Sequence, residues 1–404
     1  MKTLTLITLG LLAAGINTQA QFNSGSTGAR GPLVVATNLI VDLPDDGILH
    51  FSTVTVQPGA VLRFRKNLKN TPVYLLATGD VTIQGVIHVD GGDATLSAPF
   101  EPGRGGPGGF DGGWPGLGGI AAGDGYGPGG GKAGTDAVGG CFGAASTAGC
   151  GAYATSPSPH YGSLNKGQLY GSPLLVPMVG GSGGGGVGRS GQGVGGGGGG
   201  GGIVIASNTR IEVSGSVSAN GGRGMIFRSG CDDVNGTDPN PGSGGAIRLV
   251  APAVAGGGGL YCSGRTYGAA QGSHGRVRID TIDPRNLNLG VIGLVTYGKY
   301  MVVFPTTLPS LDIIEAAGAS IKPGAGPVTV QLPNNAPTAQ VVKLQASNFF
   351  GYVTNYVVVT PQSGPSATYV TVIDNASANP ATGNVTVTLP VSTPVSIAAW
   401  NKVP

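Results

Sequence analysis

The sequence feature that most constrains the fold is an internal repeat. Val81-Thr-Ile83-Gln-Gly85-Val-Ile87-His-Val89-Asp-Gly91-Gly92 aligns without gaps on Ile211-Glu-Val213-Ser-Gly215-Ser-Val217-Ser-Ala219-Asn-Gly221-Gly222. In each copy, apolar residues occupy every second position on either side of a central glycine, a pattern typical of two short strands joined at a bend. One such pair cannot bury its apolar face alone, so copies must stack on each other.

Each copy runs into a glycine-rich stretch that returns to another alternating segment. The returns are Ile203 and Ile205, Ile247 and Leu249, and Val277 and Ile279, and further short strands are expected at residues 47–51, 52–56, 60–64 and 73–77. Repetition at variable spacing is typical of stacked supersecondary units with loops of different length. We therefore predict an all-β chain in which residues 34–310 form a parallel β-helix, or β-solenoid, with glycine-rich insertions at about 97–202 and 221–246.

The insertions leave two structural alternatives open. The chain has 79 Gly and 29 Pro in 404 residues, which often marks disorder. However, 40% of residues are hydrophobic and only 10% are charged, the opposite of a solvated disordered chain. The insertions are either mobile, or they lie side by side as extended polyproline-II-like segments, since only glycine lets backbones approach so closely.

From about Leu311 the glycines become sparse and short alternating segments recur between turns. Seven candidate strands are residues 311–316, 328–332, 341–346, 356–360, 367–373, 385–389 and 395–400. This number and spacing predict a small immunoglobulin-like β-sandwich over residues 311–404.

The N-terminus reads as an export signal. Lys2 precedes the apolar run Leu4 to Gly15, and Thr18-Gln-Ala20 provides a small-x-small cleavage site. We expect a signal peptide at residues 1–20 and a linker at 21–33. No later apolar stretch is long enough to predict a transmembrane segment, so the mature protein is expected to be secreted or held at the surface of a bacterial cell.

Four cysteines remain after processing, and an even number in an exported chain favours disulfides. Our preferred pairing is Cys141 with Cys150 and Cys231 with Cys262, because each bond would then hold one glycine-rich insertion. Zinc is a weaker alternative, since the spacing is not C-x2-C and no histidine is close in sequence.

A candidate carbohydrate site lies at the end of the first repeat copy. Enzymes with parallel β-helices use clustered carboxylates, or basic residues with calcium, to cleave polysaccharides. The candidate residues are Asp90, Asp93, His88, Arg63 and Arg65, with Asp80, Lys66 and Lys69 nearby. The alternative is that they are the solvated half of an alternating strand, because the second copy has Ser218 and Asn220 in place of His88 and Asp90.

An oxygen-rich stretch could hold calcium. Its potential ligands are Asp232, Asp233, Asn235 and Asp238. The stretch lacks the Asp-x-Asp-x-Asp-Gly core and the distal glutamate of a calcium loop, so a polar turn beside Cys231 is the alternative. No other cofactor is expected.

The coil motif at residues 81–92, together with Gly244-Gly-Ala-Ile-Arg-Leu-Val-Ala251, resembles glycine-rich, β-helix-like exported proteins of environmental bacteria. The closing segments Val385-Thr-Val-Thr-Leu-Pro390 and Ile397-Ala-Ala-Trp400 are similar to the immunoglobulin-like tail domain found beside such coils. The resemblance implies export and a surface or extracellular setting, and it brings no active site with it.

The composition and charge of the chain limit the classes of function that are expected. A net charge of +3 from 22 basic and 19 acidic groups gives no basic stripe for nucleic acid. We expect a non-catalytic structural or adhesive protein that is adhesin-like or part of an extracellular matrix, and that binds polysaccharide or assembles with itself. The alternative is a polysaccharide lyase or hydrolase acting on an acidic glycan, and a third hypothesis is an ice- or surface-binding solenoid.

Overall fold

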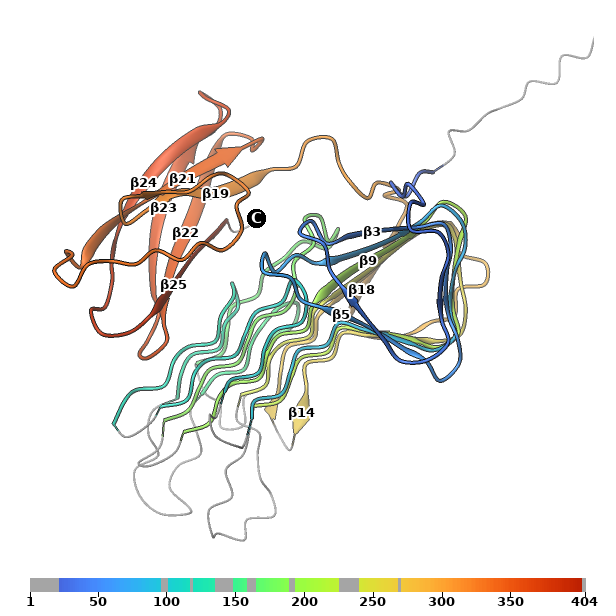
Figure 1. Ribbon diagram of the computed structural model, residues 1–404, viewed down its shortest axis with the longest axis horizontal. Coiled ribbons are helices and arrows are strands. Elements are labelled where there is room, and N and C mark those ends of the chain that lie inside the picture. Colours follow the sequence, from blue (N-terminus) through green and yellow to red (C-terminus); the bar gives the residue numbers. More distant parts are fainter. Residues whose placement is uncertain are drawn as a thin grey trace, which may run out of the picture.

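The computed structural model describes residues 22–95, 101–116, 119–134, 148–157, 165–188, 193–224, 240–267 and 270–401. The expected all-β class is confirmed, since every regular element among these residues is a strand. Figure 1 shows strands stacked around an enclosed space at the right, zigzag segments running side by side below them, and a separate group of C-terminal strands at the upper left. The expected signal peptide lies outside the described residues.

The N-terminal strands pair in three parallel ladders. The first is β1 (Leu33–Val35), β4 (Val54–Val56), β7 (Val81–Ile83), β10 (Arg210–Val213) and the end of β12 (Ala246–Ala255). The second is β2 (Leu39–Asp42), β5 (Val61–Arg65), β8 (Val86–His88), β11 (Ser216–Ser218), β13 (Gly259–Tyr261) and β17 (Gly290–Ile292). The third is β3 (Ile48–Phe51), β6 (Val73–Ala77), β9 (Gly202–Ser207), the start of β12, β16 (Arg276–Asp283) and β18 (Leu294–Gly298).

The internal repeat corresponds to strand register. Val81 pairs with Ile211 and Ile87 pairs with Val217, although 130 residues separate the partners in each pair. The two copies therefore lie directly against each other, as their gapless alignment predicts. Both copies turn at their central glycine, where a Cβ on Gly215 would collide with the carbonyl oxygen of Gly85.

The predicted parallel β-helix is wrong. Strand β12 pairs in the first ladder through Ala253 and in the third through Ala246, so these ladders form one ten-stranded sheet. Eight of its strands turn through 274° around an axis, which makes a nearly closed, barrel-like parallel sheet and no clear solenoid. The structural reason is that Ala246–Ala255 continues as one strand, whereas residues 78–80 separate β6 from β7 and residues 208–209 separate β9 from β10 in the layers beside it.

The inward side chains fill one apolar core between this sheet and the second ladder. Leu49, Leu75, Ile205 and Leu249 are fully buried there. The opposite face of the third ladder is also covered, by Tyr153, Leu175 and Met178 from the glycine-rich region. Burial on both faces explains why β9 is apolar at almost every position rather than alternating.

The described glycine-rich segments are packed and hydrogen-bonded, which favours the second of the two alternatives. Their amides follow a period of three along the chain. Gly196, Gly199 and Gly202 donate to the carbonyls of Gly113, Phe110 and Pro107, whereas Gly198 and Gly201 donate to Gly92 and Val89. The remaining pair, Gly197 and Gly200, donates to Asn240 and Ser243. Three residues per turn is the period of a polyproline-II helix, whose own backbone groups are free to bond to neighbours.

The same central segment also accepts bonds from three further directions. The carbonyls of Gly196 and Gly199 accept from Gly103 and Gly106, and those of Gly197 and Gly200 accept from Gly184 and Gly181. The carbonyl of Gly198 accepts from Gly222. Residues 196–202 thus lie inside a bundle of extended segments held together by peptide groups. We call this arrangement, within residues 89–95, 101–113, 121–134, 148–152, 180–188, 193–202 and 240–245, the glycine bundle.

Glycine is required in the bundle because no side chain fits between these backbones. A Cβ on Gly199 would collide with the carbonyl of Gly181, and one on Gly183 would collide with the carbonyl of Asp111. The high glycine content therefore serves close backbone packing in this region, not chain mobility.

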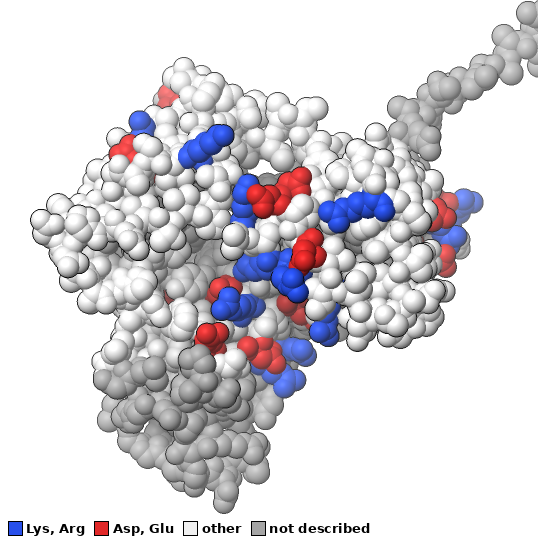
Figure 2. All heavy atoms as spheres, viewed as in Figure 1, with Lys and Arg blue, Asp and Glu red and all other residues white. Residues whose placement is uncertain are grey.

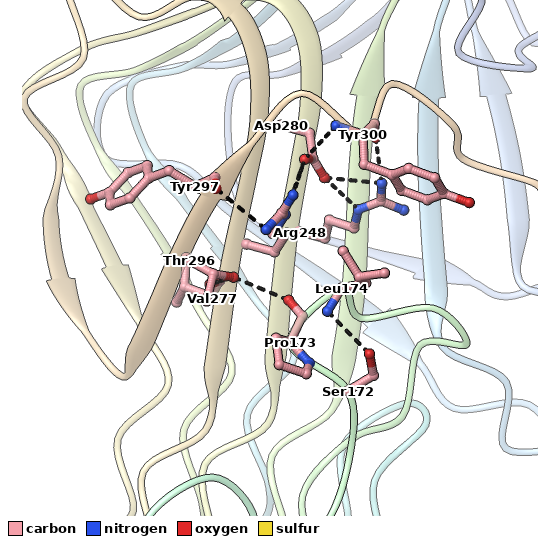
Figure 3. A network of polar contacts seen from close by, with 10 residues as sticks. Ser172, Pro173, Leu174, Arg248, Val277, Asp280, Thr296, Tyr297 and Tyr300 are labelled. Atoms are coloured by element: carbon pink, nitrogen blue, oxygen red, sulfur yellow. Dashed lines mark hydrogen bonds and ion pairs between the residues drawn. The ribbon is translucent and has the colours of Figure 1, made fainter. Parts of the chain in front are cut away.

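A buried ion cluster fastens the chain where it leaves the barrel-like sheet. Arg248 and Arg278 are in register on β12 and β16, and both bind Asp280 on β16. The Tyr300 backbone joins the cluster, since its N–H donates to Asp280 at 2.9 Å and its carbonyl accepts from Arg248 at 2.8 Å (Figure 3). The segment that leads to the C-terminal strands is thereby held against the outer face of the sheet.

The C-terminal residues form two antiparallel sheets over a shared apolar core that includes Val342, Leu344, Val357 and Ile373. One sheet has the order β20 (Ala319–Ser320), β19 (Ser310–Ala316), β21 (Ala339–Ser347), β24 (Ala381–Thr388), and the other has β23 (Ala367–Asp374), β22 (Tyr352–Pro361), β25 (Val395–Asn401). The expected strand at residues 328–332 is wrong, because these residues form no strand. The short strand β20 was not expected.

The C-terminal sheets dock on the glycine bundle through the turn between β22 and β23. The amide and hydroxyl of Ser366 donate to the carboxylate of Asp124 at 3.0 and 2.6 Å. Lys132 binds the same carboxylate at 2.9 Å, and the amide of Gly364 donates to the carbonyl of Ala122 at 3.2 Å. Asp124 is almost fully buried by these contacts.

Candidate binding surfaces

The predicted carbohydrate residues begin on the outer face of the second ladder. Arg63 on β5 is paired in register with His88 on β8. Burial lowers the pKa of His88, the carboxylate of Asp90 opposes this effect, and Arg63 adds to it. The structure therefore brings His88, Arg63 and Asp90 near one another.

The two carboxylates of this group are engaged with the backbone. Asp90 accepts the amide of Asn220 at 2.7 Å, and Asp93 accepts the amide of Arg223 at 2.7 Å. The Asn220 side chain continues the series by accepting the amide of Ser263 at 2.9 Å. These side chains tie successive layers of the chain together where strands pass into the glycine bundle, which is a structural role.

The basic residues do not converge on these carboxylates. Arg65 pairs with Asp42 at 2.7 Å, Lys66 with Asp111 at 3.3 Å, and Lys69 with Asp45 at 3.5 Å. Figure 2 shows charged side chains of both signs gathered in a band where the three parts of the molecule meet, with few charges elsewhere on this face. Of the three pairs, the one between Lys66 and Asp111 joins the N-terminal strands to the glycine bundle, and none of these basic side chains is paired with Asp90 or Asp93.

Two of the four cysteines lie among the described residues. Cys150 and Cys262 are buried free thiols, and no disulfide is seen among the described residues. Their expected partners, Cys141 and Cys231, lie outside those residues. Burial raises the pKa of Cys150 to about 12 and that of Cys262 well above its usual value, so both thiols are protonated at neutral pH.

The proposed calcium ligands, Asp232, Asp233, Asn235 and Asp238, also lie outside the described residues. Elsewhere in the part of the chain that is described, no three acidic, histidine or cysteine side chains are grouped as metal ligands would be. No helix in that part is long and apolar enough to cross a membrane.

The surface that sequence reasoning missed is the outer face of the sheet β23-β22-β25. Val353, Val357 and Val359 point into the C-terminal core, so the alternate residues of β22 point outward. Cross-strand register places Tyr356 between Val370 and Trp400. We call this surface the aromatic face, and it comprises Tyr352, Thr354, Tyr356, Val370, Val372, Ala398 and Trp400.

The aromatic face is open at one end. Tyr352 is 76% exposed, and Val370 and Val372 are each 55% exposed. At the other end, Val358 and Thr360 are buried, next to the turn that docks on the glycine bundle. The sequence signal for this face was the alternation Tyr352-x-Thr354-x-Tyr356, which carries aromatic residues on the side opposite the buried valines.

Comparison with known proteins finds no matching family, no matching curated protein and no matching solved structure.

Proposed function

We propose that this protein is an exported, non-catalytic structural or adhesive scaffold whose partners are polysaccharide or further copies of itself. The observation that carries the proposal is the glycine bundle, in which backbone hydrogen bonds every third residue join segments up to about a hundred residues apart. Such a bundle fixes the relative positions of segments mainly through bonds between peptide groups. A bacterial surface or extracellular location is part of the proposal and rests on the N-terminal signal.

The charge arrangement supports a non-catalytic role. A general acid and base for glycoside cleavage need free carboxyl groups that face each other across a substrate. Asp90 and Asp93 instead accept main-chain amides, and neighbouring Arg65, Lys66 and Lys69 are held in separate ion pairs. These contacts favour a scaffold over the alternative of a lyase or hydrolase.

The test uses the chain from residue 21 to 404, incubated with insoluble and soluble polysaccharides, neutral and acidic. Co-sedimentation measures binding, and a reducing-end assay measures cleavage in the same samples. We expect binding without new chain ends. Release of chain ends that is abolished by Asp90→Asn, while an exposed control such as Asp283→Asn stays active, would overturn the proposal in favour of an enzyme.

A further inference from the structure

The two outer faces of the C-terminal sheets differ in character. The outward residues of β19, β21 and β24 are mostly polar, with Val341 as an exposed exception, and one row aligns Glu315, Lys343 and Asn384 in register. The aromatic face on the opposite side instead aligns Val370, Tyr356 and Trp400. Exposure to solvent favours polar residues on both outer faces, so it does not account for the apolar and aromatic residues of the aromatic face.

We propose that the aromatic face is a binding site for a neutral polysaccharide. This inference rests on the proposed adhesive function and assigns its ligand class and its residues. The ring faces of a sugar carry apolar C–H groups that stack on Tyr and Trp, and the sugar hydroxyls at the ring edges need polar partners. Tyrosine and tryptophan offer both an apolar ring and a hydrogen-bonding group on one side chain.

Polar partners lie next to the aromatic rings. Asp374 is paired in register with the exposed Tyr352 and lies on the same side of β23 as Val372. Its carboxylate is oriented by the amide of Ala376 at 3.0 Å and by the Ser377 amide and hydroxyl, and these bonds lower its pKa. An ionised carboxylate held at the edge of an aromatic platform accepts hydrogen bonds from sugar hydroxyls.

Charge selects among glycans. Asp374 is the one ionised side chain among the described outward residues of β22, β23 and β25. An acidic glycan would be repelled by it, and within the described part of this face no cation compensates. The complementary ligand is therefore uncharged.

The length of the face sets the size of the ligand. Tyr352 and Tyr356 are four residues apart on one strand, which separates them by about 14 Å. This distance exceeds one pyranose ring, so an oligosaccharide or a longer chain is required to contact both tyrosines. A stack on the half-buried pair Tyr356 and Trp400 would extend to the exposed Tyr352.

The experiment measures binding of the chain from residue 21 to 404 to soluble neutral oligosaccharides of β-glucan, xylan and mannan, with polygalacturonate as the acidic comparison. Titration calorimetry gives the affinity of the wild type and of Tyr352→Ala. The matched control is Lys343→Ala on the polar outer face. We expect at least one neutral oligosaccharide to bind, with affinity at least ten-fold weaker in Tyr352→Ala and unchanged in Lys343→Ala.

Tryptophan fluorescence provides an independent readout, because the chain has only Trp114 and Trp400. The ligand-induced change should persist in Trp114→Phe and disappear in Trp400→Phe. Glycan binding that is unaffected by Tyr352→Ala and Trp400→Phe would overturn this binding site and leave the proposed adhesive function standing.

Binding of the acidic glycan alone would overturn the proposed class of ligand. If no glycan binds but sedimentation shows a dimer that Tyr352→Ala disrupts, the face is a contact between copies and the proposal fails. New reducing ends would contradict the proposed function itself.

Discussion

Arg248 and Asp280 form a two-pronged ion pair, with Nε and Nη2 of the arginine 3.1 and 3.0 Å from Oδ2 of the aspartate, and their side chains are 1% and 0% exposed. Arg278 binds the other carboxylate oxygen at 2.7 Å. One carboxylate is therefore the shared counter-ion of two guanidinium groups on adjacent strands, and the cluster keeps a net charge of +1. Asp280 thus binds both arginines and the amide of Tyr300, while Arg248 binds the Tyr300 carbonyl.

Replacing Asp280 with asparagine should destabilise the protein strongly. The substitution leaves two buried guanidinium groups without a counter-ion, a change that costs about 3–5 kcal/mol in comparable cases. Urea unfolding followed by circular dichroism measures the loss. The control is Asp283→Asn, which removes an exposed pair with Arg285 and should leave the midpoint unchanged. Equal midpoints for Asp280→Asn and wild type would show that the cluster contributes nothing.

Replacing Gly199 with alanine should disrupt the glycine bundle. The added methyl group would collide with the backbone of Gly181, which cannot move aside as a flexible side chain can. Overpacking of this kind costs about 1–3 kcal/mol or more. Gly257→Ala is the matched control, since open space surrounds that position. Thermal unfolding of both variants distinguishes them, and similar melting temperatures would contradict close packing of the bundle.

His88 should make stability depend on pH below neutrality. Burial lowers its pKa from the usual value of about 6.5, so the folded protein binds the proton less tightly than the unfolded chain. The contribution of the neutral imidazole is complete above that value and is lost as the pH falls below it. His88→Gln should therefore lose less stability than the wild type between pH 7 and pH 5.

His274 should contribute to the same pH dependence of stability, because burial also lowers its pKa. Combining His88→Gln with His274→Gln should flatten the pH dependence further than either change alone. Parallel losses for the wild type and the double variant would exclude both histidines as its cause.

The buried thiols should be unreactive in the folded protein. Thiolates are the reactive species, and burial raises the pKa of Cys150 to about 12. In a Cys141→Ser, Cys231→Ser variant, only Cys150 and Cys262 remain for a chromogenic disulfide reagent. At pH 8 we expect reaction only after denaturant is added, and rapid labelling of the folded protein would contradict their burial.

Much of the strand pairing could be predicted because it follows local alternation. Residues 81–92 and 211–222 share a pattern, and a shared pattern permits one register in which apolar residues stay inside. The curvature could not be predicted from this. Whether Ala246–Ala255 bends between two sheets or continues through both depends on its neighbours across the ladder and not on its own residues.

The packing of the glycine-rich segments was left open for a related reason. Their bonds join positions such as Gly196 and Gly113, and glycine has no side chain whose type would indicate in the sequence which backbone it packs against.

The strand predicted at residues 328–332 was wrong for a different reason. It alternates like a strand, but proline precedes and follows it, and part of the neighbouring edge of β19 is taken by Ala319–Ser320. The pairing of Arg63 with His88 follows from neighbouring strands, but the role of Asp90 as an acceptor of a main-chain amide depends on its partner, Asn220, from the other repeat copy.

The glycine bundle also determines how stability responds to temperature. Unfolding of apolar surface raises the heat capacity, whereas exposure of peptide groups lowers it. Segments such as 196–202 are buried against other backbones and release mainly peptide groups when they unfold. The heat capacity increment per residue should therefore fall below the usual range of about 12–15 cal/mol/K. A smaller heat capacity increment makes the free energy of unfolding vary less with temperature. The folded state then stays stable to lower temperatures without a larger maximum free energy of unfolding.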